Sequence, residues 1–249
     1  MTSKLPTKLE NGPLVDAGFE VLFESHLPLA TVLPGYLFSM LGGSEIERMP
    51  NADIPQQLRD SEPNLQFIPL VNITIPGFRI SVGDRSLQVC CLLPYPGWSS
   101  FKEKILETLN VVLNAKIATS VIRYSLKYTD ILPADFSGGE SKKISASVAI
   151  GGREIDLSKT NIQTQIHEGD TITLLNIAGG VTVQLTAGNE ERTGVLVNID
   201  SINAIDKLSL EEFVGVASVQ LDSLHEINKR MFFDCLSEEG LKALGPSYA

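Results

Sequence analysis

The chain has 249 residues, of which 43% are hydrophobic and 20% are charged, and this composition is typical of a folded globular protein. It carries 20 Lys and Arg against 30 Asp and Glu, which gives a formal net charge of −10. So acidic a chain does not favour a broad nucleic-acid or anionic-membrane surface, because such surfaces need clustered cations. The length suits one large domain or two of roughly 100 to 150 residues.

The cysteines and the first 20 residues indicate in which cellular compartment the protein is expected. Cys90, Cys91 and Cys235 are too few and wrongly spaced for a disulfide framework or a structural zinc site. Their apolar neighbours predict buried, reduced thiols. The first 20 residues lack the apolar core of a signal peptide, and no run of 18 apolar residues occurs. We therefore expect a cytoplasmic protein with no membrane association.

The first quarter of the chain predicts few regular elements. Residues 1–13 contain two prolines and no periodicity, which indicates an exposed leader. A strand is expected over 14–24, followed by a helix over 27–41 that ends at two glycines. Residues 44–64 are polar and contain three prolines. They predict a long loop.

The next segment alternates sheet and helix. Three short apolar or alternating runs separated by glycine-containing turns predict an antiparallel meander over 67–75, 78–82 and 86–93. Ser100 followed by Glu103 predicts a capping box at the start of an amphipathic helix that runs to about residue 114. Residues 122–129 then alternate apolar and polar, as in a strand with one buried face.

Cations on this strand are the first candidates for binding. Arg123 and Lys127 both occupy odd positions and are expected on one face, where they would suit a phosphate, a carboxylate or an acidic partner. The better-supported interpretation is that they pair with carboxylates of a neighbouring strand or keep an exposed face hydrated. Tyr128 and Arg79 complete the candidate set for a ligand or partner, although Arg79 is expected to pair with local acids.

The second half predicts another sheet. Gly138 and Gly139, flanked by polar residues, indicate a linker and a domain boundary near residue 138. Five strands about ten residues apart then form a predicted antiparallel meander. Their expected ranges are 144–150, 161–167, 171–177, 181–187 and 195–202, with turns at Gly151-Gly152, 168–170, Gly179-Gly180 and Gly188-Asn189.

A long helix closes the chain. Ser209 with Glu212 predicts a capping box, and Ser237 predicts the start of a last short helix. Apolar residues along the long helix follow steps of four and three, the coiled-coil period. One interpretation is a homodimer or partner seam; the other, favoured, is a helix packed along its own sheet. The candidate interface residues are Leu221, Leu224, Asn228 and Met231, with Asn228 as the polar residue of the seam.

These elements predict an α+β fold of two similar-sized lobes, each an antiparallel β-meander packed against a long amphipathic helix. The lobes are expected over 14–137 and 138–249, after the leader at 1–13. Both lobes are expected to consist of several strands followed by one long helix. This common order suggests an internal duplication, but no residue-level similarity supports it.

Four short motifs stand out along the chain. They are Phe78-Arg79-Ile80 with Leu87-Gln88-Val89, Tyr95-Pro96 with Phe101, the strand over 122–130, and Leu224-His225 with Phe232 or Phe233. Together they resemble a sporadically distributed family of uncharacterised bacterial proteins of about 250 residues. Where that family has arginine and asparagine in its "LRYIN"-like strand, this chain has Lys127 and Asp130. The resemblance implies a compact bacterial α+β protein and, through its patchy distribution, mobile operons of the defence or toxin–antitoxin type. It supplies no catalytic residues.

The absence of known catalytic and cofactor-binding motifs from the sequence favours a binding protein over an enzyme. HExxH, GxSxG, CxxC, a dinucleotide fingerprint and a phosphate-binding GxxxxGK[ST] loop do not occur in the sequence. We expect no cofactor and no metal, while carboxylate-only sites stay open. The first hypothesis is a non-catalytic interaction protein with a protein partner. The alternative is a receptor for a small anionic ligand, in which a sheet grips a helix.

Overall fold

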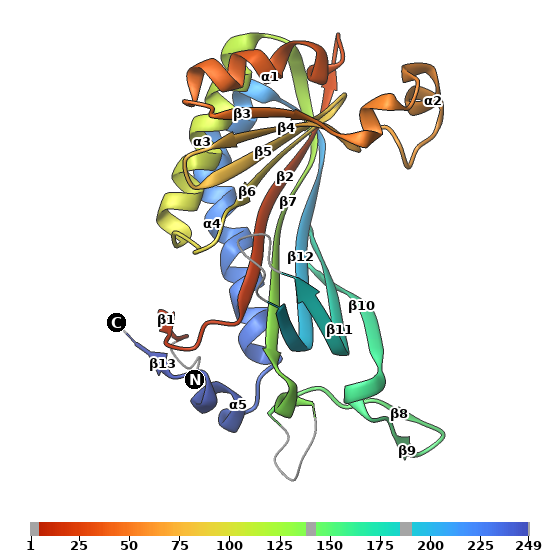
Figure 1. The fold of residues 1–249 in the computed structure, drawn as a ribbon, viewed down its shortest axis with the longest axis vertical. Coiled ribbons are helices and arrows are strands. Elements are labelled where there is room, and N and C mark those ends of the chain that lie inside the picture. Colours follow the sequence, from red (N-terminus) through yellow and green to blue (C-terminus); the bar gives the residue numbers. More distant parts are fainter. Residues whose placement is uncertain (1–4, 138–142, 185–190, 249) are drawn as a thin grey trace. The chain divides into compact units, whose positions relative to one another are not determined.

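A computed structural model describes residues 5–137, 143–184 and 191–248 (Figure 1). The protein is α+β with a large antiparallel sheet, as the sequence predicts. It divides into two compact units. Unit A consists of Ala17–Leu126 and Ile202–Leu224, and unit B of Met1–Asp16, Lys127–Ser201 and His225–Ala249.

The two units interleave along the chain. Four elements contribute residues to both units: β2 (Leu14–Ser25), β7 (Ala118–Pro133), β12 (Glu191–Ser209) and α4 (Leu210–Asp234). The units therefore differ from the contiguous lobes over 14–137 and 138–249 that the sequence predicts. The expected boundary at residue 138 lies outside the described residues.

Unit A contains the predicted meander. In the sheet the strands follow the order β2, β6, β5, β4, β3, and each neighbouring pair is antiparallel. Gly77 has a φ of +77° at the β4–β5 turn, a conformation that glycine adopts without strain. The strands are β2 (Leu14–Ser25, in this unit from Ala17), β3 (Glu45–Arg48), β4 (Pro69–Ile75), β5 (Phe78–Gly83) and β6 (Ser86–Cys91).

Helices α1 (Leu29–Met40) and α3 (Trp98–Ala115) contact each other and the sheet of unit A. The predicted amphipathic face of α3 is confirmed, since residues at steps of three and four are buried from Phe101 to Val112. The predicted capping box is wrong. The helix begins at Trp98 with Gly97 as its N-cap, so Ser100 lies inside the first turn.

The predicted loop over 44–64 is also wrong, because it contains three short elements. They are β3, the 3-10 helix η1 (Pro50–Asp53) and α2 (Gln56–Ser61). Strand β3 forms by pairing its backbone with β4, with Ile46 opposite Ile73. Residues 44–64 are polar and show no strand periodicity, so the pairing of β3 with β4 is not predicted from the sequence.

In unit B the strands follow the order β10, β11, β12, β7 as part of the large sheet, not as the separate sheet that the sequence predicts for the second half of the chain. Strand β10 (Asn161–Glu168) pairs antiparallel with β11 (Thr171–Gln184). The predicted turn at Gly179-Gly180 is wrong, because β11 continues through it. A Cβ at Gly179 would lie 2.1 Å from the carbonyl oxygen of Leu157, so glycine here permits a close backbone approach. The predicted turn at Gly188-Asn189 lies outside the described residues.

Shorter elements complete unit B. The strand expected over 144–150 is regular only at β8 (Ala149–Ile150), which pairs with β9 (Arg153–Glu154). Within the expected leader, β1 (Lys8–Leu9) pairs with β13 (Pro246–Ser247). Two 3-10 helices, η2 (Ala134–Phe136) and η3 (Leu157–Lys159), and α5 (Glu238–Ala243) make up the rest.

Helix caps behave as predicted in the last part of the chain. In unit A, the hydroxyl of Ser209 accepts a bond from the Glu212 amide at 3.2 Å, and the Glu212 carboxylate accepts one from the Ser209 amide at 3.1 Å. The bonds that the Glu212 carboxylate accepts from the Ser209 hydroxyl and from the Ser209 amide lower the pKa of Glu212. In unit B, Ser237 caps α5 by accepting from the Gly240 amide. In the described parts of the chain, the helices are all too short or too polar to cross a membrane.

Each unit has its own apolar core. In unit A it includes Phe19, Phe23, Leu37, Ile80, Ile105, Tyr124 and Phe213. In unit B it includes Leu132, Phe136, Ile177, Val195, Val197, Ile199, Phe232 and Leu236. Each fully buried side chain of this size contributes roughly 1.5 to 3 kcal/mol relative to its exposed state.

Candidate functional site

Arg123, the first predicted cation, lies in unit A and is engaged in an ion pair. Its guanidinium donates to Glu20 on β2, and the same carboxylate accepts a 2.8 Å bond from Gln88 on β6. The Nε atom of Arg123 is buried, and none of the described residues accepts a bond from it. The pairing of a strand cation with a carboxylate of another strand is thus present, as the better-supported interpretation predicts.

The other predicted binding residues do not join Arg123 in one cluster within unit A. Arg79 lies on β5, and strands β6 and β2 separate β5 from β7 in the sheet order. Its Nε atom is also buried without an acceptor among the described residues. Lys127 belongs to unit B, where its side chain is exposed.

Tyr128 is buried in unit B. Its hydroxyl lies 3.2 Å from Nδ1 of His225, and the two rings are 5.8 Å apart between centroids. This contact joins β7 to α4 inside the unit. Tyr128 therefore packs within the chain and does not present its hydroxyl on a surface.

The predicted seam of α4 is also largely buried within the chain. In unit A, Leu221 and Leu224 are almost fully inaccessible. In unit B, Met231 packs against the apolar core, and the buried amide of Asn228 donates to the Ile199 carbonyl at 3.1 Å and to the Ser201 hydroxyl at 3.3 Å. The favoured interpretation, a helix packed along its own sheet, describes these contacts.

Replacing Asn228 by alanine is expected to lower the free energy of unfolding by about 1 to 3 kcal/mol, because buried hydrogen-bond partners lose their donor. Glu226→Ala changes an exposed residue on the same helix and should stay within about 0.5 kcal/mol of the parent. Urea unfolding followed by circular dichroism measures both. Equal stabilities of the two variants would contradict the role assigned to the Asn228 amide.

A pocket of about 380 Å³ lies in unit A, next to the segment predicted as a loop. Helix α1, β3, η1, α2 and β4 all contribute to its wall. Most of the lining is small or apolar, and the charged lining residues are two arginines and one aspartate. The lining consists of Ala30, Thr31, Pro34, Gly35, Ile46, Arg48, Ala52, Arg59, Leu70, Val71 and Asp84.

Arg59 and Asp84 form a buried ion pair on this wall. Nε of Arg59 donates to Oδ2 of Asp84 at 2.8 Å, and the two side chains are only 10% and 7% exposed. A terminal guanidinium nitrogen of Arg59 also donates to the carbonyl oxygen of Ile54. A guanidinium has five N–H donors, so these two bonds leave further donors for a third acceptor.

Arg48 adds a second, exposed guanidinium to the same pocket. It donates to the Ala52 carbonyl at 2.9 Å and pairs at 2.9 Å with Asp53, with side chains 67% and 75% exposed. The lining carries two arginines and the carboxylate of Asp84, while Asp53, the ion-pair partner of Arg48, lies outside the lining. Planar guanidinium groups match the geometry of carboxylate and phosphate oxygens. The pocket is therefore suited to a small organic anion.

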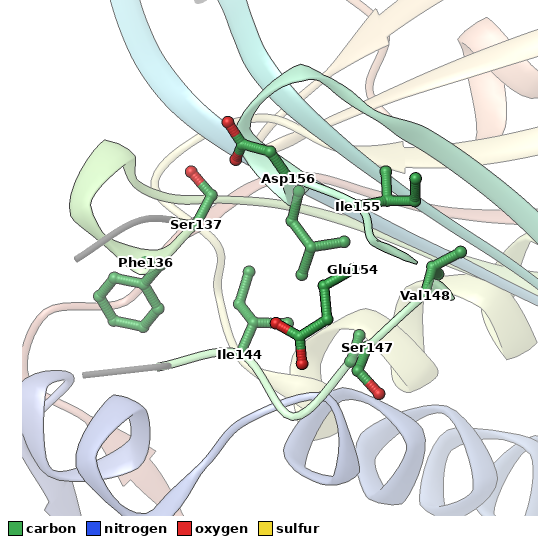
Figure 2. Close-up of a pocket in the computed structure, with 10 residues that line it drawn as sticks. Phe136, Ser137, Ile144, Ser147, Val148, Glu154, Ile155 and Asp156 are labelled. Atoms are coloured by element: carbon green, nitrogen blue, oxygen red, sulfur yellow. The ribbon is translucent and has the colours of Figure 1, made fainter. Parts of the chain in front are cut away.

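A second pocket, of about 350 Å³, lies in unit B (Figure 2). Among the described residues, its lining carries two carboxylates and no cationic side chain. Figure 2 shows the Glu154 side chain extending toward Ile144 and Ser147, while the Asp156 carboxylate points away from them. Asp156 instead accepts bonds from the Ser158 amide and hydroxyl, which lower its pKa. This pocket does not suit an anion.

The pocket arginines of unit A were not among the residues singled out from the sequence. Arg48 and Arg59 lie in the segment interpreted as a loop, and Asp84 in a tight turn. One available signal was the occurrence of two arginines and several apolar residues within a predicted loop of 21 residues. Only the pairing of β3 with β4 shows that this segment packs beside α1.

Within the described residues, no three His, Cys, Asp or Glu side chains are grouped closely enough to hold a metal ion. The sequence was also compared with known proteins: no protein-family model matches the chain, and no curated protein matches it. The assignment of a function therefore depends on the geometry of the chain itself.

Proposed function

We propose that this protein is a non-catalytic cytoplasmic binding protein whose unit A binds a small organic anion. The single observation that carries the proposal is the buried guanidinium of Arg59 on the wall of the 380 Å³ pocket. The sequence analysis considered the same function as its alternative, a receptor for a small anionic ligand, with Arg123 and Lys127 as candidate binding residues. The proposal assigns the binding to Arg48 and Arg59 instead.

The contacts around Arg59 support recognition of an anion by a prepared site. Asp84 and Ile54 hold its guanidinium in place before any ligand binds, so little side-chain entropy is lost on binding. Apolar walls from Pro34, Ile46 and Leu70 suit the carbon skeleton of a ligand. A carboxylate or phosphate group attached to a short apolar body fits both features.

Thermal unfolding of the full chain tests the proposal with a panel of probes: inorganic phosphate, short dicarboxylates, aromatic carboxylates and phosphomonoesters. A ligand present at 100 times its dissociation constant adds about 2.7 kcal/mol of stability. Arg48→Ala is expected to weaken that ligand about tenfold or more, because it removes a charge-assisted contact. Arg48 is exposed, so this variant should fold like the parent.

Two controls make the result decisive. Sodium chloride at matched ionic strength measures general screening, and Arg153→Ala removes an exposed arginine of unit B without touching the pocket. The proposal fails if no probe stabilises the chain beyond the chloride control. It also fails if Arg48→Ala retains the full stabilisation.

A second candidate function is the interaction protein considered first from the sequence. The observation that favours it is that several large apolar side chains of unit A are exposed, and contacts with other proteins are typical where such side chains form one contiguous patch. They include Val32, Met40, Ile46, Leu58, Val216 and Val219. A role in a mobile bacterial defence or toxin–antitoxin operon, implied by the family resemblance, belongs to this candidate and predicts a stoichiometric protein partner.

A further inference from the structure

Strand β10 of unit B is the end strand of its sheet. It pairs with β11 along its whole length, from Asn161 opposite Ala178 to Glu168 opposite Thr171, without a shift in register. In the described parts of the chain, no strand pairs with its other side. Figure 1 shows β10 beside β11 at the margin of the strands of this unit. Its outward N–H and C=O groups therefore form an unpaired row.

This edge lacks the features that usually prevent pairing with another chain. Edge strands are commonly protected by being short, by charged residues or proline, or by a bulge. Strand β10 has eight residues, and residues 161–166 include no charge and no proline. By contrast, β3 at the end of the unit A strand order has four residues, of which three are charged.

The sequence of β10 is complementary to itself in the antiparallel direction. Residues 162–166 read Ile-Gln-Thr-Gln-Ile, which is the same in both directions. If two copies pair around a two-fold axis at Thr164, Ile162 lies opposite the partner's Ile166, and Gln163 lies opposite the partner's Gln165. Thr164 then lies opposite its own copy, and no like charges meet along the strand.

The faces of the strand also agree with this pairing. Side chains alternate along a strand, so Ile162 and Ile166 share one face, where both are half-buried, while Gln163 and Gln165 share the other and are exposed. Their neighbours on β11, Ile177 and Thr173, continue the face that holds the isoleucines. A second copy would extend that face and would place glutamine pairs on the other.

We propose that β10 binds β10 of a second copy of this chain, antiparallel and around a two-fold axis at Thr164, to form a dimer with a sheet shared between the copies. Main-chain hydrogen bonds supply the contact, and the matched side chains select the register. One strand pair is smaller than a standard interface, so we expect dimers at chain concentrations on the order of 10 to 100 micromolar. This surface is separate from the α4 seam first considered for a homodimer and from the pocket of unit A.

Charge substitution at the two exposed glutamines tests the proposal. Replacing both with lysine (Gln163→Lys with Gln165→Lys) places lysine opposite lysine on both sides of the axis. The dimer dissociation constant should rise about tenfold or more. Gln163→Lys with Gln165→Glu changes the same positions but places lysine opposite the partner's glutamate. This matched control should stay within about threefold of the parent.

Sedimentation velocity of the full chain over a concentration series measures the dissociation constants, and circular dichroism confirms that all variants fold. A mixture of the double-lysine variant with Gln163→Glu, Gln165→Glu should form mixed dimers, observable by native mass spectrometry. The proposal is overturned if the parent stays monomeric throughout or assembles beyond a dimer. It is also overturned if the double-lysine variant dimerises as well as its matched control.

Discussion

Replacing Arg59 by alanine is expected to destabilise unit A by about 3 to 5 kcal/mol, which is a large part of the stability of a typical domain. The substitution leaves the carboxylate of Asp84 almost completely buried without its cation, and it removes the donor to the Ile54 carbonyl. An uncompensated buried charge is far more costly than the loss of the pair itself.

The same pocket contains a matched control. Arg48 and Asp53 form an ion pair with nearly the same distance between their charged atoms, but both side chains are mostly exposed. Arg48→Ala should cost only about 0 to 1 kcal/mol, because water already solvates and screens this pair. Urea unfolding followed by the fluorescence of Trp98, the single tryptophan of the chain, reports on unit A directly.

A double variant separates the charge from the packing. Arg59→Met with Asp84→Leu removes both charges and keeps apolar bulk, so it should be closer to the parent than Arg59→Ala is. If Arg59→Ala costs no more than Arg48→Ala, the ion pair does not hold the pocket together. That result would also weaken the argument that Arg59 is positioned before a ligand binds.

Asp130 is expected to make the stability of unit B decrease as the pH rises from about 4 to 7. Burial raises the pKa of its carboxyl to about 7, against an ordinary value of 3.8. Between these two values the unfolded chain has released this proton while the folded chain still holds it. Stability therefore falls with pH in this window, by about 4 kcal/mol in total at roughly 1.4 kcal/mol per pH unit.

The comparison with Asp130→Asn isolates this contribution, because the amide does not titrate. Other carboxylates also change stability with pH, but they are the same in both proteins and cancel in the difference. The variant should gain stability relative to the parent as the pH rises from 4 to 7, and the gain should then level off. Urea unfolding at several pH values, followed by circular dichroism, measures it. A difference that does not vary with pH would contradict a buried, protonated Asp130.

The neighbourhood of Asp130 agrees with this expectation. Burial, together with smaller contributions from the charges of Asp234 and Asp130, raises the pKa of the Cys235 thiol to about 11. Cys235 is therefore a neutral thiol at physiological pH, as the apolar surroundings of the cysteines predict. Asp130, which lies in the strand over 122–130 of the sequence motif, is buried inside the unit.

Elements whose signals are local can be predicted from the amino-acid sequence alone. The amphipathic face of α3, the antiparallel meander of β4 to β6, the cap at Ser209 and the α+β class follow from periodicity, turn residues and capping patterns. The interpretation of the α4 seam as a face packed within the chain was likewise the one favoured from the sequence.

Features that depend on contacts between distant residues cannot be predicted in this way. Residues 45–48 form β3 because their backbone pairs with that of β4. Glycine is needed at position 179 of β11 because the backbone of Leu157 lies too close for a side chain. The pocket joins Arg59 to Asp84, 25 positions away, through a desolvated ion pair that no local spacing indicates. The edge position of β10 likewise comes from the strand order of the sheet. The self-complementary sequence of β10 can pair with a second copy only at the sheet edge, because both sides of an interior strand are already paired.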